Sequence, residues 1–226
     1  MSYLTLLTLR LTAGAAQLDE ALRVRHANYL ACLQNADGGF PGRQGPSDLY
    51  YARFALRGLA LTGELSEAVA APAGEFLQSR LAAPLPPVDF LSLASGAVLL
   101  ELVFGIDVFA WAGIDRRQAV LDRTAPFYRS DGGYGKTERG ASSTYHTFLT
   151  AACLELVGAA VPDRSATVGL VGSRRRDDGG YVELAPLGQS GTNPTAAAVG
   201  LLRLMDAMDE PTRLAAAAFL ASMQSA

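Results

Sequence analysis

Residues 28–63 read NYLACLQNADGGFPGRQGPSDLYYARFALRGLALTG and predict a helix, a glycine turn and a second helix. The first part has apolar residues at helical spacing and ends in an Asp-Gly-Gly triplet at 37–39, where glycines can take the positive φ angles that stop a helix. Ser47 and Asp48 then offer side-chain oxygens to the unpaired N–H groups of a new helix, whose apolar face begins at Leu49. The stretch is therefore expected to form a helical hairpin.

The Asp-Gly-Gly triplet, each time followed by an aromatic residue, occurs three times with a fixed spacing. Asp131 and Asp178 are 47 residues apart, and Asp37 and Asp131 are 94 apart, which is twice that spacing. A fixed period of this length predicts repeated hairpin units. The missing second turn should lie near residue 84, where Ala83-Pro84-Leu85-Pro86-Pro87 replaces the glycines and still breaks the helix. The helix caps after the three turns are expected at Ser47-Asp48, Ser143-Thr144 and Thr192-Asn193.

The whole chain predicts an all-α protein, because apolar residues follow helical spacing and strand-like alternation is missing. No linker divides the sequence, so residues 1–226 are expected to form a single domain. The connection at 106–113 contains Trp111, which we expect to pack in the core. Helices are predicted near residues 3–14, 19–34, 48–62, 65–80, 88–104, 115–128, 143–157, 163–175, 193–207 and 210–224.

Charge and composition exclude some classes of function. The net charge of −3 provides no basic field, so nucleic acid is not an expected partner. No apolar run in the sequence approaches the ~20 residues that cross a bilayer, so no membrane span is expected. The two cysteines, Cys32 and Cys153, lie in apolar helix faces and are expected to be buried free thiols of a cytoplasmic protein.

The residues that define the repeat also carry a resemblance to a known family. The motif QNADGGF, the Ser-Asp cap and the helix FALRGLALTG resemble the repeat of protein prenyltransferase β subunits and of squalene or oxidosqualene cyclases. The resemblance covers roughly residues 20–226 and implies an α/α toroid, in which inner and outer rings of helices surround a central apolar cavity. Because the motif serves to form turns and to pack helices, it implies the architecture and does not by itself imply a chemical activity.

The resemblance to prenyltransferase β subunits also implies a zinc site, but one of its ligands is replaced. In that family an Asp-x-Cys pair at the start of one helix and a histidine near the start of a later helix hold the metal. His146 matches the histidine and Asp89 the aspartate, whereas Leu91 stands in the cysteine position. Two ligands without the soft thiolate hold zinc weakly. We therefore expect no metal site and no cofactor, with zinc at Asp89 and His146 as the alternative.

Charged residues elsewhere in the chain suggest two other kinds of chemistry. The Asp-x-Asp-Asp acid motif of squalene cyclases has no counterpart, since Asp177-Asp178 belongs to a turn. The basic run Arg174-Arg175-Arg176 is either an anion clamp for a diphosphate or a helix C-terminus, where cations meet the negative end of the helix dipole. The helix terminus is the preferred interpretation.

The candidate ligand-binding residues directly follow the helix caps in two repeats. Asp48 and Tyr50 begin one helix, and Tyr145 and His146 begin the equivalent helix two repeats later. On a toroid, such positions face the mouth of the cavity, where hydroxyls and an imidazole can orient the polar head of an isoprenoid or other apolar ligand. The alternative is that these side chains pack between neighbouring helices with their polar atoms satisfied locally.

These observations leave three functional hypotheses. The first is a protein that binds an isoprenoid or other lipid-like ligand, with altered or lost zinc chemistry. The second is an active prenyltransferase that moves an isoprenoid from its diphosphate onto an acceptor. The third is a non-catalytic scaffold whose partner is another protein. Assays of zinc content and of prenyl diphosphate binding distinguish them.

Overall fold

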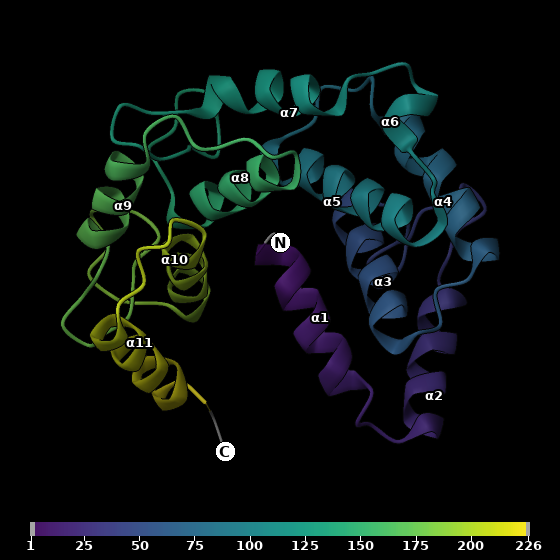
Figure 1. Ribbon diagram of the computed structural model, residues 1–226, viewed down its shortest axis with the longest axis horizontal. Helices are drawn as coiled ribbons and strands as arrows, with labels where there is room; N and C mark the ends of the chain where they lie inside the picture. Colours follow the sequence, from purple (N-terminus) through teal and green to yellow (C-terminus); the bar gives the residue numbers. More distant parts are fainter. Residues whose placement is uncertain (1–2, 225–226) are drawn as a thin grey trace. The chain divides into compact units, whose positions relative to one another are not determined.

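The computed structural model describes residues 3–224, in which helices are the only regular elements and are joined by loops (Figure 1). This confirms the predicted all-α class. The helices are α1 (Tyr3–Ala15), α2 (Glu20–Ala31), α3 (Leu49–Thr62), α4 (Glu67–Arg80), α5 (Pro87–Phe104), α6 (Val108–Trp111), α7 (Arg116–Thr124), the 3-10 helix η1 (Ala125–Phe127), α8 (Thr144–Leu156), α9 (Arg164–Ser173), α10 (Thr192–Leu204) and α11 (Glu210–Ser222).

Each of the ten predicted helices is present, and the structure differs from the prediction in the connection between α5 and α7. The short helix α6 was not predicted, because four residues are too few to show a helical period. Trp111, at its end, was expected in the core but is 50% exposed, so that prediction is wrong. Val108 and Phe109 of the same helix are buried instead and anchor this connection.

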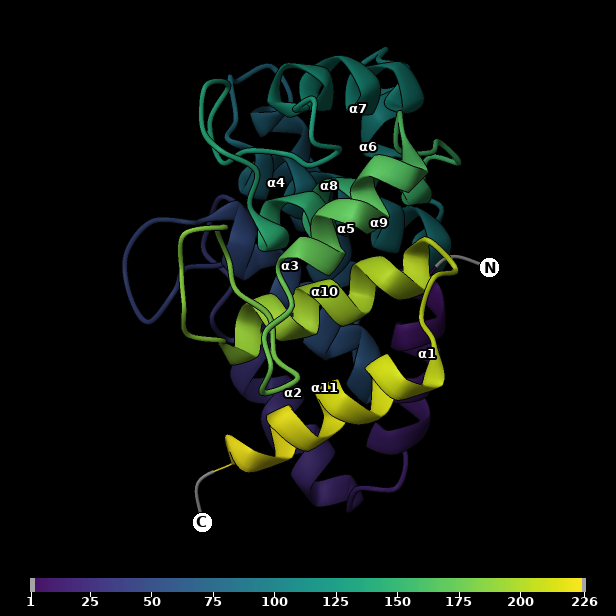
Figure 2. The ribbon, with the colours of Figure 1, turned by 90° about the vertical axis from the view of Figure 1, so that its left-hand side faces the viewer.

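The chain forms two compact units, divided between Ala119 and Val120. In the first unit, α3 packs against α1, α2 and α5, while α4 packs against α5 and α6. In the second unit, α10 packs against α8, α9 and α11, and Figure 2 shows α10 and α11 running side by side. Each unit is therefore built on a pair of mutually packed helices, α3 with α5 and α8 with α10. The single domain remains a prediction.

Helix α5 is the most apolar element and lies in the core of the first unit. It is 18 residues long with a mean hydropathy of 1.7, so it is one helix among residues 3–224 with the length and composition of a membrane span, and no clear span is present in this part of the chain. This is weak evidence for a span, because the buried core helix of a globular domain passes the same test. The packing of α5 against both α3 and α4 accounts for its apolar character.

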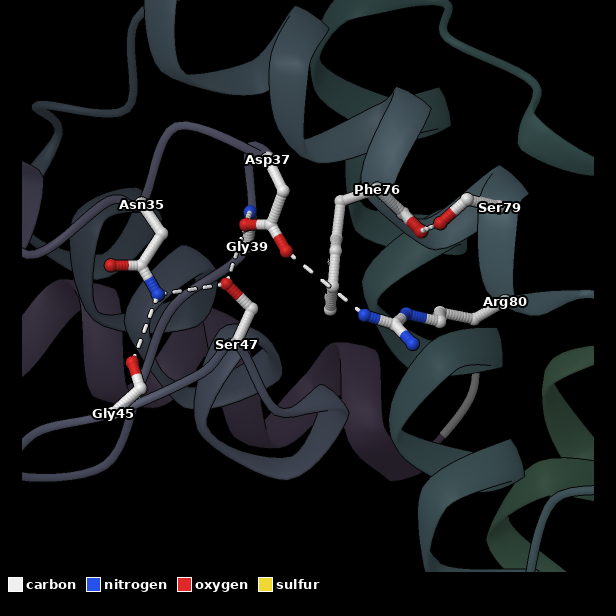
Figure 3. Close-up of polar contacts among 8 residues, drawn as sticks. All are labelled: Asn35, Asp37, Gly39, Gly45, Ser47, Phe76, Ser79 and Arg80. Carbon is white, nitrogen blue, oxygen red and sulfur yellow. Dashed lines mark hydrogen bonds and ion pairs between the residues drawn. The ribbon is translucent and has the colours of Figure 1, made fainter.

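The three Asp-Gly-Gly turns are held by the same hydrogen bonds. Asp37 Oδ1 accepts the N–H of Gly39 at 3.1 Å and the hydroxyl of Ser47 at 2.6 Å, and Asn35 also donates to Ser47 at 3.0 Å (Figure 3). The second and third turns repeat the aspartate contacts to a glycine N–H and a serine hydroxyl. These pairs are Asp131 with Gly133 (3.1 Å) and Ser142 (2.6 Å), and Asp178 with Gly180 (2.9 Å) and Ser190 (2.8 Å).

The N-cap of the helix after each turn lies one residue beyond the serine that holds the aspartate. Asp48 and Ser143 are the N-caps of α3 and α8, as predicted. The cap predicted at Thr192-Asn193 is wrong, because α10 begins at Thr192 with Gly191 as its N-cap and without a capping side chain. Ser47 was likewise expected to cap a helix, but its hydroxyl is used by the turn.

The first glycine of each turn is required by its φ angle and by its closeness to a following helix. Gly38 has a φ of 81°, and a Cβ added to it would lie 2.0 Å from the carbonyl oxygen of Pro72 in α4. Gly132 (φ 86°) approaches the backbone of α9 in the same way, and Gly179 (φ 83°) that of α11. Each turn therefore rests on the backbone of the next helix but one, which only glycine permits.

The two cysteines differ in exposure. Cys153 is fully buried in α8, as expected. Cys32 is exposed, so the expectation that it is buried is wrong. It is the C-cap of α2, and its thiol donates to the carbonyl of Tyr29 at 3.1 Å.

Candidate functional site

In the first unit, Asp48 and Tyr50 lie together at the start of α3. Asp48 is exposed, and its Oδ1 accepts the N–H groups of Tyr50 at 2.9 Å and Tyr51 at 3.2 Å. One carboxylate oxygen is therefore committed to the helix terminus, where a negative charge is favourable. Any contact of Asp48 with a ligand would have to use its other oxygen.

An aromatic cluster, Tyr50, Tyr51 and Phe54, follows this cap. The Tyr50 ring meets Tyr51 and Phe54 edge to face, with ring centroids 5.5 and 4.9 Å apart. Tyr51 is 48% and Phe54 47% exposed, so the cluster presents a large apolar surface outside the core. The guanidinium of Arg53 lies 5.6 Å from the Phe54 ring centroid, in cation–π range. The exposed rings of Tyr51 and Phe54 leave this cluster accessible from outside the core.

Arg57 extends this face of α3 and was not predicted as a site residue. Tyr50, Phe54 and Arg57 are spaced to share one side of the helix. The Arg57 side chain is half-buried, and its buried Nε and Nη2 atoms have no hydrogen-bond partner within residues 3–224. Burial lowers the pKa of Arg57, an effect that Tyr3 opposes. A cation in an otherwise apolar helix was a visible signal in the sequence.

Asp89 and Leu91 lie at the start of α5, in two of the three positions that the family resemblance assigns to zinc ligands. Asp89 is half-buried, and its burial, together with the carboxylate of Asp48, raises its pKa. Leu91 is 2% exposed and belongs to the core, so it supplies no donor atom where the family resemblance places a thiolate. Among residues 3–224, no group of three His, Cys, Asp or Glu side chains is placed to hold a metal ion. The residues present do not fit the zinc site of the resembling family.

In the second unit, Tyr145 and His146 begin α8 and lie beside each other. Their rings meet edge to face, with centroids 5.8 Å apart. Ser143, the N-cap, accepts the backbone N–H of His146 at 3.1 Å, and its hydroxyl oxygen lies 2.9 Å from His146 Nδ1. The Nδ1 atom of the half-buried imidazole therefore lies within hydrogen-bond distance of the capping residue Ser143.

Glu183 completes this group of polar side chains and was not predicted as a site residue. The Ser143 hydroxyl donates to Glu183 Oε1, which also accepts the N–H of Tyr145 at 3.2 Å. The backbone around Glu183 is fixed by Thr144, whose hydroxyl donates to the carbonyl of Val182 at 2.7 Å and whose N–H donates to that of Glu183 at 3.1 Å. Glu183 is thus held against the N-terminus of α8 by main-chain bonds as well as by its carboxylate.

The charge state of His146 follows from this environment. Burial lowers its pKa, the carboxylate of Glu183 acts in the opposite sense, and Lys136 adds a smaller lowering effect. Burial is the largest of these effects, so the neutral imidazole is favoured in the folded protein.

The basic run at 174–176 is engaged in holding the turn. Arg174 is 5% exposed, and its Nη2 donates to the carbonyl of Ser142 at 3.1 Å. Arg176 donates to the carbonyls of Ala185 and Leu187 at 3.1 and 2.8 Å. Arg175 lies within 3.4 Å of the Thr212 hydroxyl. These contacts support the preferred interpretation of the run as a helix terminus.

The four predicted site residues are thus found in two separate groups. Asp48 contacts Tyr50 in the first unit, and Tyr145 contacts His146 in the second. Asp48 is the N-cap of α3 and Tyr50 lies in its first turn, and Tyr145 and His146 lie in the first turn of α8 after its N-cap Ser143. Their binding of a ligand remains a prediction.

Comparison with known families identifies the class of protein. The family model described as the prenyltransferase alpha-alpha toroid domain matches residues 2–87 and 95–226, which is nearly the whole chain. The chain therefore belongs to the prenyltransferase alpha-alpha toroid family, and the resemblance drawn from the turn motifs is confirmed. A comparison with curated proteins finds no match.

Proposed function

We propose that the protein binds an isoprenoid or other lipid-like ligand and that the zinc chemistry of prenyltransferase β subunits is altered or lost in it. Family membership supports an isoprenoid as the class of ligand. The aromatic cluster on α3 supports an apolar binding surface, because two of its three rings are about half exposed. A cytoplasmic location is part of the same proposal.

The observation that carries the loss of zinc chemistry is the burial of Leu91. Asp89 and His146 stand in the positions that the resemblance assigns to the aspartate and histidine ligands, but Leu91 fills the thiolate position with a core side chain. Catalytic zinc sites keep three protein ligands and one open position. With the thiolate missing, the remaining pair is a weak site for a borderline-soft metal.

An active prenyltransferase is the second candidate, because Asp89 and His146 are both present. Its test is the transfer of a labelled prenyl group from the diphosphate to a thiol-containing peptide. Transfer by the wild-type protein that a chelator abolishes would establish this second candidate and refute the loss of zinc chemistry.

The proposed function is tested by metal content and ligand binding in protein purified without chelators or a histidine tag. We expect no stoichiometric zinc in the wild type, and zinc content is measured in parallel in Leu91→Cys, which supplies a thiolate at the position where the resemblance places one. Leu93→Cys is the matched control, since Leu93 is equally buried in α5 but lies outside the Asp-x-Cys spacing. Stoichiometric zinc in the wild type would refute the loss of the site.

Binding is measured by calorimetry with farnesol and farnesyl diphosphate, two probes that share one isoprenoid chain. Binding of either one supports the proposal. If neither binds, the isoprenoid proposal fails, and the protein-interaction scaffold becomes the leading hypothesis.

A further inference from the structure

The hydroxyl of Ser143 has three neighbours at the start of α8, and they determine where its single proton lies. Its partners are the carboxylate of Glu183, Nδ1 of His146 and the backbone N–H of His146. A serine hydroxyl has one proton to donate and two lone pairs that accept. The carboxylate can only accept, and the backbone N–H can only donate. The proton therefore goes to Glu183, and one lone pair goes to the N–H.

The remaining lone pair of Ser143 faces His146 Nδ1 at 2.9 Å. This contact is a hydrogen bond only if Nδ1 carries the proton. In a neutral imidazole one nitrogen is a donor and the other an acceptor, and the hydrogen bond made by one nitrogen selects the state of the other. A proton on Nδ1 leaves Nε2 with its lone pair free to accept, and Nε2 has no hydrogen-bond partner within the part of the chain that the structure describes.

We propose that Glu183, acting through Ser143, holds His146 in the Nδ1–H tautomer and makes Nε2 an acceptor site for the hydroxyl group of a ligand. Glu183 and Ser143 are positioning residues, and His146 is the group that touches the ligand. A lone pair on Nε2 attracts an O–H donor and repels the oxygens of an ionised diphosphate. The ligand inference rests on the proposed function and narrows it to an isoprenoid with an alcohol head group.

The tautomer is tested first, by ¹H–¹⁵N correlation spectra of the imidazole rings. The chain has only two histidines, and exposed His26 in α2 serves as an internal reference. At a pH where His146 is neutral, we expect Nδ1 to be the protonated nitrogen. In Glu183→Ala the Ser143 proton is free to donate to Nδ1, so the Nε2–H tautomer should become the major form.

Two further variants separate this arrangement from a loss of charge or of fold. Glu183→Gln retains an acceptor without the charge and should keep the Nδ1–H tautomer. Glu138→Ala removes an exposed carboxylate from the same unit and should change nothing. A wild-type spectrum dominated by Nε2–H, or a Glu183→Ala spectrum identical to wild type in a folded protein, overturns the role of Glu183.

The ligand inference is tested with three probes on the wild-type chain: farnesol, farnesyl methyl ether and farnesyl diphosphate. We expect farnesol to shift the Nε2 resonance of His146 and to bind roughly tenfold more tightly than the ether, which lacks the donor, since one hydrogen bond contributes about this factor. Equal binding of alcohol and ether, or tighter binding of the diphosphate, overturns the acceptor role of Nε2. Failure of all three probes overturns the alcohol ligand together with the proposed function, whereas the tautomer measurement stands independently of both.

Discussion

Replacing Gly38 by alanine tests the close contact between the first Asp-Gly-Gly turn and α4. Two costs add at this position. An L-residue at the φ of 81° is strained by about 1–2 kcal/mol, and the new Cβ would lie 2.0 Å from the Pro72 carbonyl oxygen, so that backbone must move. Overpacking of this kind costs about 1–3 kcal/mol. We expect Gly38→Ala to lower the free energy of unfolding by about 2–5 kcal/mol.

Gly63→Ala is the matched control for the first of these costs. Gly63 has a φ of 79°, but an added Cβ has no heavy atom within 4 Å, so only the strain of about 1–2 kcal/mol remains. Urea unfolding followed by the fluorescence of Trp111, the single tryptophan, reports on the first unit, and circular dichroism reports on all helices. Equal losses of stability in the two variants would refute the argument that the turn is seated on α4.

Three further predictions concern single side chains. Asp89→Asn should raise the free energy of unfolding at neutral pH, but not at a pH below the usual titration range of aspartate. Burial and Asp48 raise the pKa of Asp89, so the protonated carboxyl favours folding at low pH and this stabilisation is lost as the pH rises through the raised pKa. Equal gains in urea melts at both pH values would contradict this. Ser142→Ala should lower the free energy of unfolding by about 1 kcal/mol, because Asp131 loses a 2.6 Å hydrogen bond. The control Ser165→Ala, at an exposed position, should leave the free energy of unfolding nearly unchanged in the same melts. Burial lowers the pKa of His146, so stability should fall as the pH drops from the usual histidine range through this lower value, and thermal melts of His146→Asn should show a smaller fall.

The helices and turns could be predicted because their signals are local. The period of the Asp-Gly-Gly triplets and the helical spacing of apolar residues depend on residues close together in sequence. The assignment of Ser47 failed for a related reason, since Ser47 and Asp48 both have side-chain oxygens suited to a cap. Their roles differ only because the turn folds back and brings the Asp37 carboxylate to Ser47.

The polar group around His146 was only partly predictable. Tyr145 and His146 follow a cap that is visible in the sequence, but Glu183 reaches Ser143 from 40 residues away, in the next repeat. No period links these two positions, because the contact is made between neighbouring repeats. The one indication of Glu183 in the sequence was its position, since it is a charged residue two positions after the buried aromatic Tyr181.

Because each turn packs against a later helix, residues far apart in the sequence should unfold together. Gly179 lies against the backbone of α11, and a Cβ on Gly180 would meet the Phe219 ring at 2.9 Å, so the third turn is closed from outside by α11. When α11 detaches in a local opening, the glycine amides of this turn become exposed with it, although they lie about thirty residues before α11 begins. Hydrogen exchange at Gly179 and Gly180 should therefore report the opening of α11, whereas the N–H of Tyr181 keeps its hydrogen bond to Thr195 in α10. Fraying of α11 thus exposes part of a turn that precedes it in the chain.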